Sequence, residues 1–140
     1  MTPQVEITKD LTGPHHIRRA VFIDEQGFTE AEEWDDLDHD AVQLLIRDGA
    51  TPVASARLLR DGNTGKIGRI CVLRPYRGRG LGARLVTFGI DHFRATPGVD
   101  SVYLSAQTHA LPFYEALGFA PYGDSYLDGS VPHRDMSLTL

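Results

Sequence analysis

The chain has 140 residues, of which 41% are hydrophobic and 24% charged, and its formal net charge is −5. This length fits a single domain over residues 1–140 that can bury a hydrophobic core, and the negative charge argues against nucleic-acid binding, which needs a basic surface. The sequence has no apolar run that could span a membrane, no signal-peptide pattern and one cysteine, Cys71, which excludes an internal disulfide and a cysteine-rich zinc site. We therefore expect a cytoplasmic protein that binds neither membranes nor nucleic acid.

The first half of the chain predicts a strand, a helix and three further strands. Ile17, Ala20 and Val21 recur at helical spacing, and Asp48-Gly49 between two apolar runs is typical of a hairpin turn. The acidic segment 24–40 is predicted as a loop with one helical turn near 30–34. The regular elements, in order, are a strand at 4–8, a helix at 11–22 and strands at 41–47, 53–60 and 66–73.

The second half predicts two helices, a strand between them and a final hairpin. A long amphipathic pattern begins near Gly80 and ends before Pro97, and Pro112 and Gly118 bound a shorter helix. The remaining elements are a strand at 99–106, this helix at 110–117, and strands at 119–127 and 132–138. The complete order, β-α-β-β-β-α-β-α-β-β, predicts an α/β fold: a mixed sheet covered by helices, with one strand-helix-strand crossover.

The charges are separated along the chain. Acidic residues dominate between positions 20 and 46, where there is no Lys or Arg, and basic residues dominate between 57 and 84. Each block alone is typical of a solvated surface, but together they suggest one end for a cationic ligand and one for an anionic ligand. The acidic residues are Asp24, Glu25, Glu30, Glu32, Glu33, Asp35, Asp36, Asp38 and Asp40, and the basic ones are Arg57, Arg60, Lys66, Arg69, Arg74, Arg77, Arg79 and Arg84.

The segment "RPYRGRGLGARL", residues 74–85, has three interpretations. A phosphate loop of the NTPase type would need a Lys followed by a hydroxyl residue, and neither is present. A dinucleotide fingerprint fits Gly78, Gly80 and Ala83, with Asp100 at a suitable distance, but it should follow the first strand of a parallel sheet rather than an antiparallel meander. The third interpretation is an anion cradle, in which glycine N–H groups and a helix N-terminus bind a pyrophosphate.

Two motifs resemble the GNAT N-acetyltransferase superfamily. "RICVLRPYRGRGLGARL" resembles its coenzyme A motif, with the core Arg77, Gly80 and Gly82, and "AQTHALPFYEALGF" resembles the helix and strand that complete its site. The segments "VFIDEQGF" and "DGSVPHRDM" are similar to the ElaA/YjcF branch of that superfamily. The resemblance implies the GNAT fold over nearly the whole chain, and it is compatible with a homodimer.

The resemblance also implies acetyl-CoA as co-substrate. No metal is expected, because Asp38, His39 and Asp40 are adjacent in sequence and would not converge on one ion. The backbone of Ile70, Cys71 and Val72 would bind the pantetheine arm, and one N–H there would polarise the thioester carbonyl. The pyrophosphate would be held by the backbone of the motif residues Arg77, Gly78, Arg79, Gly80, Leu81, Gly82 and Ala83.

Three residues are candidates for proton transfer. The resemblance assigns Tyr114 as the general acid for the departing thiolate, although the same residue could be only a core aromatic. Glu25 and then His133 are the candidates for the general base that deprotonates the amine, and each could instead be structural. Cys71 in an apolar strand is expected to be a buried hydrophobe rather than a covalent nucleophile, so direct transfer is expected.

The predicted function is acetyl transfer to a primary amine of a small molecule or peptide. If the acidic segment borders the acceptor side, it would favour a cationic amine. Two other functions stay open at this stage: a non-catalytic acyl-CoA-binding sensor or regulatory module, and a small nucleotide-binding domain.

Overall fold

The structure is a computed structural model, and it describes residues 4–140. One mixed sheet runs through these residues in the strand order β1-β2-β3-β4-β5-β7-β6. Neighbouring strands are antiparallel except for β4 and β5, which are parallel and joined by a helical crossover. The strands are β1 (Val5–Thr8), β2 (Val42–Asp48), β3 (Thr51–Asp61), β4 (Thr64–Val72), β5 (Ser101–Gln107), β6 (Ala120–Asp128) and β7 (Val131–Thr139).

The helical elements confirm the predicted order and add detail in the acidic segment. The helices are α1 (Thr12–Arg18), η1 (Arg19–Glu25), α2 (Glu30–Glu33), α3 (Leu81–Arg94) and α4 (Leu111–Ala116), with single 3₁₀ turns η2 (Arg74–Tyr76) and η3 (Thr108–Ala110). The predicted helix at 11–22 therefore continues to Glu25, with π-helical geometry from Arg19 onward. The helical turn expected near 30–34 is α2, and it begins with a capping box between Thr29 and Glu32.

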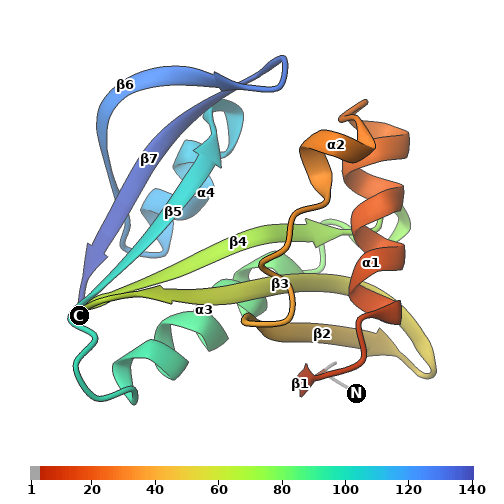
Figure 1. The fold of residues 1–140 in the computed structure, drawn as a ribbon, viewed down its shortest axis with the longest axis horizontal. Coiled ribbons are helices and arrows are strands. Elements are labelled where there is room, and N and C mark those ends of the chain that lie inside the picture. The colour runs from red at the N-terminus through yellow and green to blue at the C-terminus, as the bar shows by residue number, and fades with distance from the viewer. Residues whose placement is uncertain (1–3) are drawn as a thin grey trace.

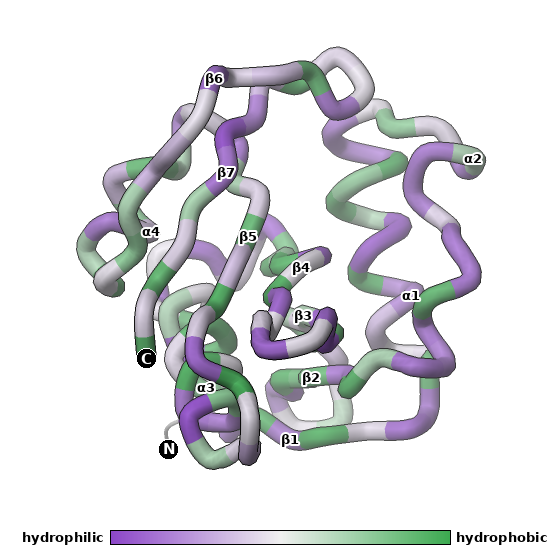
Figure 2. The backbone as a smooth tube through the Cα atoms, turned by 60° about the vertical axis from the view of Figure 1, so that its left-hand side comes forward, coloured by the Kyte–Doolittle hydropathy of each residue, from purple (hydrophilic) through white to green (hydrophobic). Residues whose placement is uncertain are grey.

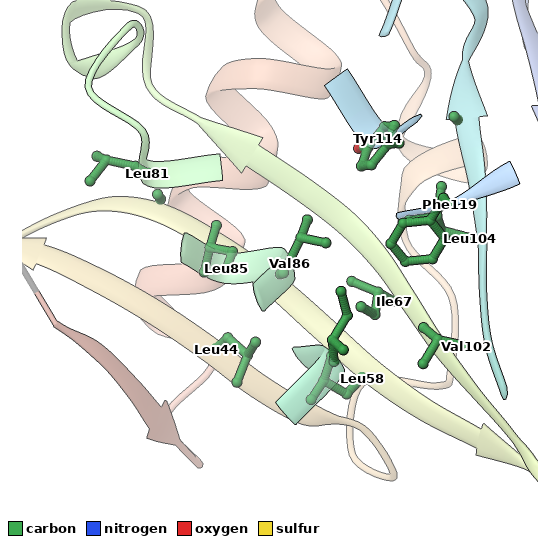
Figure 3. Close-up of a cluster of buried hydrophobic side chains, with 14 of the residues drawn as sticks. Leu44, Leu58, Ile67, Leu81, Leu85, Val86, Val102, Leu104, Tyr114 and Phe119 are labelled. Carbon is green, nitrogen blue, oxygen red and sulfur yellow. The ribbon is translucent and has the colours of Figure 1, made fainter. Parts of the chain in front are cut away.

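The main core lies between α3 and one face of the sheet. Leu81, Leu85 and Val86 of α3 pack against apolar residues of β2, β3 and β4 (Figure 3), as the helical spacing of the apolar residues predicts. Gly89 allows the close approach of this helix, because an added Cβ would lie 2.8 Å from Ile67 Cδ1. A smaller cluster, Ile17, Val21, Leu45 and Cys71, packs α1 and η1 against the opposite face.

The sheet divides where β4 meets β5. Their pairing covers Thr64↔Ser101, Gly65↔Val102 and Lys66↔Tyr103, and it ends there. Beyond these residues the two strands diverge, with β5 held by β7 and β4 held by β3 (Figure 1). The divergence opens a gap in the middle of the sheet.

The segment around α2 is strongly hydrophilic in sequence but is not simply a solvated surface (Figure 2). Glu33 and Asp38 of this segment are 3% and 7% exposed. Within residues 4–140, no helix is both long enough and apolar enough to cross a membrane.

Candidate functional site

A cavity of about 500 Å³ occupies the gap between β4 and β5. One wall is β4, the opposite wall is formed by β5 and β7, and η1 and the segment before α2 cover one side. The lining includes these predicted site residues: Ile70, Cys71, Val72, Arg77, Tyr114 and His133. The cavity therefore brings the β4 residues, Arg77, Tyr114 and His133 together. Its lining does not include Glu25 or the other predicted pyrophosphate-binding residues, Gly78, Arg79, Gly80, Leu81, Gly82 and Ala83.

Two contacts cross the cavity and join its walls. The Gln107 Nε2 amide at the end of β5 donates to Gln26 Oε1 at a distance of 2.9 Å. The turn between β6 and β7 approaches the segment before α2 closely, because an added Cβ on Gly129 would lie 2.8 Å from Phe28 Cε1 and 2.9 Å from Glu32 Oε2. The cavity is thus framed by segments far apart in the sequence.

The β4 wall contains a β-bulge. Cys71 pairs with Ser55 of β3, but Gly68 pairs with Arg57, so one residue of β3 lies opposite two residues of β4, Arg69 and Ile70. Arg69 has a φ of 51°, and among residues 4–140 it is the one non-glycine residue with a positive φ. The bulge therefore changes the backbone direction where β4 borders the cavity.

The backbone of β4 presents donors to the cavity on its side away from β3. The Leu73 N–H donates to the Val53 carbonyl of β3 at 2.9 Å. Because N–H directions alternate along a strand, the N–H groups of Val72 and Ile70 face away from β3, into the gap that β5 leaves. In agreement, the Val72 carbonyl accepts from Arg77 Nε at 3.0 Å on that side.

Cys71 contributes to this wall without exposing its thiol. The side chain is 4% exposed and packs with the α1–η1 cluster. Its Sγ atom lies 3.5 Å from Ser55 Oγ. Burial raises the pKa of the Cys71 thiol to about 12, so the group is a neutral thiol at physiological pH rather than a nucleophilic thiolate.

The glycine-rich segment turns tightly into the N-terminus of α3. Gly78 and Gly80 have φ values of 78° and 79°, which glycine adopts without strain. The first helical hydrogen bond runs from the Arg84 N–H to the Gly80 carbonyl at 3.1 Å. The earlier N–H groups of α3 therefore precede the helical ladder and, with the helix dipole, form a surface suited to an anion.

The arginine side chains of this segment are engaged by protein groups. Arg77 donates to both oxygens of Glu25 at 2.8 Å, and the Arg79 guanidinium lies over the Tyr76 ring, 5.1 Å from its centroid. The backbone, rather than these two guanidinium groups, is accordingly the natural ligand for a pyrophosphate.

Glu25 joins the end of η1 to the glycine-rich segment. Besides the two hydrogen bonds from Arg77, its carboxylate lies 3.3 Å from Arg74 Nη2. The hydrogen bonds from Arg77, assisted by the charges of both arginines, lower the pKa of the Glu25 carboxyl. A carboxylate held in this way is a weaker base, and its geometry fits the positioning of Arg77.

Tyr114 lies in α4 with its ring in the core and at the cavity edge. The residue is 9% exposed and packs edge-on against Phe113 and Phe119 at centroid distances of 5.0 and 6.3 Å. Burial raises the pKa of the Tyr114 hydroxyl to about 12, so it carries its proton throughout the neutral range. It can act as a proton donor.

His133 lies on the opposite wall, in β7. It is 6% exposed, and its Nδ1 lies 2.8 Å from the Val131 carbonyl, which can only accept. In the neutral ring the proton is therefore on Nδ1, and Nε2 has a free electron pair. Asp128 Oδ2 lies 4.0 Å from Nε2.

The β5–β7 wall contains a tyrosine–aspartate cluster that the sequence analysis did not identify. Tyr103 and Tyr126 both donate to Asp135 Oδ1, at 2.6 and 2.7 Å, and Tyr126 also contacts Ser105 Oγ. Burial and then the hydrogen bond to Asp135 raise the pKa of Tyr103. Strand alternation was the available signal, because the face opposite the buried residues of β5 must line the gap.

The expectation of a solvated acidic surface is wrong for Glu33 and Asp38. Both belong to a buried ion network of three arginines and three carboxylates: Arg18, Arg57, Arg69, Glu33, Asp35 and Asp38. The network forms because each buried charge needs a partner. Glu32 and Glu33 both line the cavity, but Glu32 is exposed.

The Asp38 carboxylate lies at the centre of this network. It accepts from Arg18 Nη1 at 2.7 Å and from Arg57 Nη1 at 3.2 Å, and it lies 3.0 Å from His15 Nε2. Burial alone would raise the pKa of Asp38, but the hydrogen bonds and charge of Arg18, with those of His15 and Arg57, outweigh it and hold the pKa well below its ordinary value.

Comparison with known proteins agrees with this geometry. The acetyltransferase (GNAT) family model matches residues 9–119. The N-acetyltransferase YjcF of Bacillus subtilis is 32% identical over 129 residues, which are 91% of this chain and 91% of YjcF.

Solved structures agree as well. The crystal structure of Escherichia coli ElaA superposes with a TM-score of 0.86 at 28% identity, covering 98% of this chain and 99% of ElaA. A Bacillus subtilis acetyltransferase in complex with CoA superposes with a TM-score of 0.74 at 15% identity, covering 99% of each chain. At that identity the second comparison concerns the fold alone.

Proposed function

The chain belongs to the acetyltransferase (GNAT) family and is similar to its ElaA and YjcF members, and on this premise we propose that it transfers an acetyl group from acetyl-CoA directly to a primary amine. The observation that carries the proposal is the cavity between β4 and β5. It joins the edge of β4 at Ile70 and Val72, the protonated hydroxyl of Tyr114 and the side chain of Arg77, which begins the segment that leads into α3.

The donor would lie along β4. Its pyrophosphate would bind the backbone of residues 77–83, with the helix dipole of α3 favouring negative charge. Its pantetheine arm would pair with the free edge of β4 at Ile70 and Val72. A Bacillus subtilis acetyltransferase of similar fold forms a complex with CoA, which supports CoA as the class of ligand.

The reaction would proceed in one ternary complex. The neutral amine nitrogen attacks the thioester carbon, a C–N bond forms, and negative charge builds on the carbonyl oxygen, where the Ile70 N–H stabilises it. The C–S bond then breaks, and the thiolate takes the proton of Tyr114. Before the attack, the Nε2 of His133 takes one proton from the substrate ammonium, directly or through a water, which leaves the neutral amine. After the C–N bond has formed, the nitrogen loses a second proton to solvent, and solvent returns a proton to the Tyr114 phenolate.

Of the two predicted bases, His133 has the more suitable geometry. Its Nε2 electron pair is free in the neutral ring, and the residue lines the cavity. Glu25 is held by Arg77 outside the lining residues, and its lowered pKa makes it the weaker base.

Two carboxylates at one side of the cavity favour a cationic acceptor there, whereas the lining elsewhere includes Arg57, Lys66, Arg69 and Arg77. Glu32 and Asp128 line the side formed by α2 and the β6–β7 turn, and the arginines of residues 74–84 lie at the CoA side. A field of this direction would draw a polyanionic donor to one end and an ammonium group to the other. The cytoplasmic location and the homodimer stay predictions.

Binding and turnover test the proposal together. Thermal-shift measurements should show stabilisation by acetyl-CoA and none by ATP or NAD, and an amine panel that includes amino acids and polyamines should release thiol from acetyl-CoA. Acetyl-CoA binding with no turnover across the panel would instead favour an acyl-CoA-binding module without catalysis.

A glycine pair tests the anion cradle. Gly80→Ala should lower acetyl-CoA affinity by about tenfold, because an alanine strains this backbone, whose φ is 79°. Gly62→Ala introduces the same strain at a φ of 60° in the β3–β4 turn, costing stability of about 1–2 kcal/mol, and should leave affinity unchanged. Equal affinity in both variants would refute the cradle.

A further inference from the structure

Arg69 has an unusual backbone conformation, and it directly precedes Ile70, whose N–H is proposed to donate to the thioester carbonyl. Its φ of 51° lies in the left-handed region, which costs a non-glycine residue about 1–2 kcal/mol. Strain of this kind persists where the surrounding structure holds it, and it occurs often at functional sites.

The conformation of Arg69 controls one N–H group. The Ile70 N–H belongs to the peptide plane between Arg69 and Ile70, so its direction follows from the ψ of Arg69 and the φ of Ile70. On this stretch β4 has lost its pairing with β5, which ends at Lys66. The sheet therefore holds this peptide from the β3 side only.

The Arg69 side chain supplies the missing anchor. Its Nη2 donates to the Glu33 carbonyl oxygen at 3.0 Å, and its guanidinium lies 3.1 Å from Glu33 Oε2 and 3.5 Å from Asp35 Oδ2. Both carboxylates belong to α2 and the segment that follows it, so this anchor comes from outside the sheet.

The anchor itself is fixed. Glu33 is 3% exposed and accepts from Arg18 Nε at 2.8 Å, and Asp35 accepts from both terminal nitrogens of Arg57 at 2.7 Å. The three arginines and three carboxylates of the network balance in charge, which permits their burial. Movement of Glu33 would disrupt several charge-assisted hydrogen bonds at once.

We infer that Glu33 and Asp35 are positioning residues: through the Arg69 side chain they fix the β4 bulge so that the Ile70 N–H is directed at the thioester carbonyl oxygen. The inference rests on the proposed function, because it needs a bound acetyl thioester. It gives the acidic segment a part in the reaction that is separate from attracting the acceptor.

Arg69→Gly separates the side-chain anchor from the backbone strain. Glycine adopts a φ of 51° without cost, so the variant can keep the bulge while losing both carboxylate contacts. The infrared stretch of the carbonyl in bound ¹³C-acetyl-CoA reports the hydrogen bond directly and requires no acceptor. In the wild type this band should lie below that of free acetyl-CoA.

In Arg69→Gly the carbonyl band should return toward its position in free acetyl-CoA, and kcat should fall about tenfold or more. The dissociation constant of CoA, which has no thioester, should stay within about threefold of the wild-type value. Arg69→Lys, which restores one cation, should recover part of the band shift. Arg47→Gly is the matched control, because Arg47 also lies at a β-bulge and is ion-paired, with Glu6, away from the cavity.

The outcomes separate the two proposals. A wild-type band shift that persists in Arg69→Gly overturns the positioning role and leaves the acetyltransferase assignment intact. Acetyl-CoA binding without any wild-type shift overturns the Ile70 donor. No binding of acetyl-CoA by the wild type overturns the proposed function and this inference with it. If Arg69→Gly does not fold, the band of Arg69→Lys decides. A shift smaller than that of the wild type supports the positioning role, and a shift equal to that of the wild type overturns it.

Discussion

Replacing Tyr114 with phenylalanine removes one hydroxyl and leaves the ring in place. The edge-on contacts with Phe113 and Phe119 do not involve the oxygen, so the free energy of unfolding should change by no more than about 1 kcal/mol. The proposed mechanism loses its proton donor to the thiolate. The expected effect is therefore on kcat, with little change in acetyl-CoA affinity.

The magnitude follows from the two pKa values. General acids contribute about 10²–10⁴-fold, and the contribution is largest when the acid is stronger than the group that it protonates. Burial raises the pKa of Tyr114 to about 12, whereas a thiol has a pKa of about 8.5. Complete transfer of the proton from Tyr114 to the thiolate is thus unfavourable. We therefore expect the loss of kcat in Tyr114→Phe to lie at the lower end of this range, about 100-fold, which corresponds to about 2.7 kcal/mol.

The assay is thiol release from acetyl-CoA under saturating donor, with calorimetry of CoA binding on the same samples. Tyr122→Phe is the matched control, because Tyr122 is 46% exposed in β6 and lies outside the cavity. A kcat within about threefold of the wild type in Tyr114→Phe would refute the assignment. A parallel loss of CoA affinity would show that the hydroxyl serves binding instead.

Three further results are expected. Cys71→Ala should keep kcat within about threefold of the wild type. Iodoacetamide at pH 8 should not label the wild type, because burial raises the pKa of the Cys71 thiol to about 12. An acetyl group retained on the protein after gel filtration would contradict direct transfer. Gly65→Ala should lower the free energy of unfolding in urea by about 1–3 kcal/mol, because an added Cβ overlaps the Phe93 ring, and Gly68→Ala, where a Cβ meets no atom within 4 Å, should cost less. The folded-state pKa of Asp38 is lowered, so its contribution to stability is present above the ordinary carboxyl pKa of 3.8 and is lost as the pH falls below it. The free energy of unfolding, measured from pH 7 to pH 3, should therefore decrease mainly below pH 4. An equally steep decrease in Asp38→Asn would contradict this.

The local features of the chain could be predicted because their signals are local. The apolar spacing of α3, the turn at Asp48-Gly49 and the glycines at 78 and 80 depend on neighbours a few residues away. The element order followed from them and is confirmed, and with the motif around Tyr114 they led to the prediction of an anion cradle and a donor side, which stay predictions. The same signals did not predict the π-helical part of η1, because tertiary packing, rather than residue type, decides where a helix widens.

The sequence by itself determined the element order and the family to which the chain belongs, and it predicted a CoA-binding segment, since glycine positions and hydrophobic periodicity are properties of short segments. The tertiary structure alone decided the environment of the charges. Glu33 is buried only because Arg18 and Arg69, from distant segments, meet it there, and Glu25 loses basicity only because Arg77 lies opposite. The energy of a charge depends on its burial and on its partners in space, and neither can be read from the residues beside it in the chain.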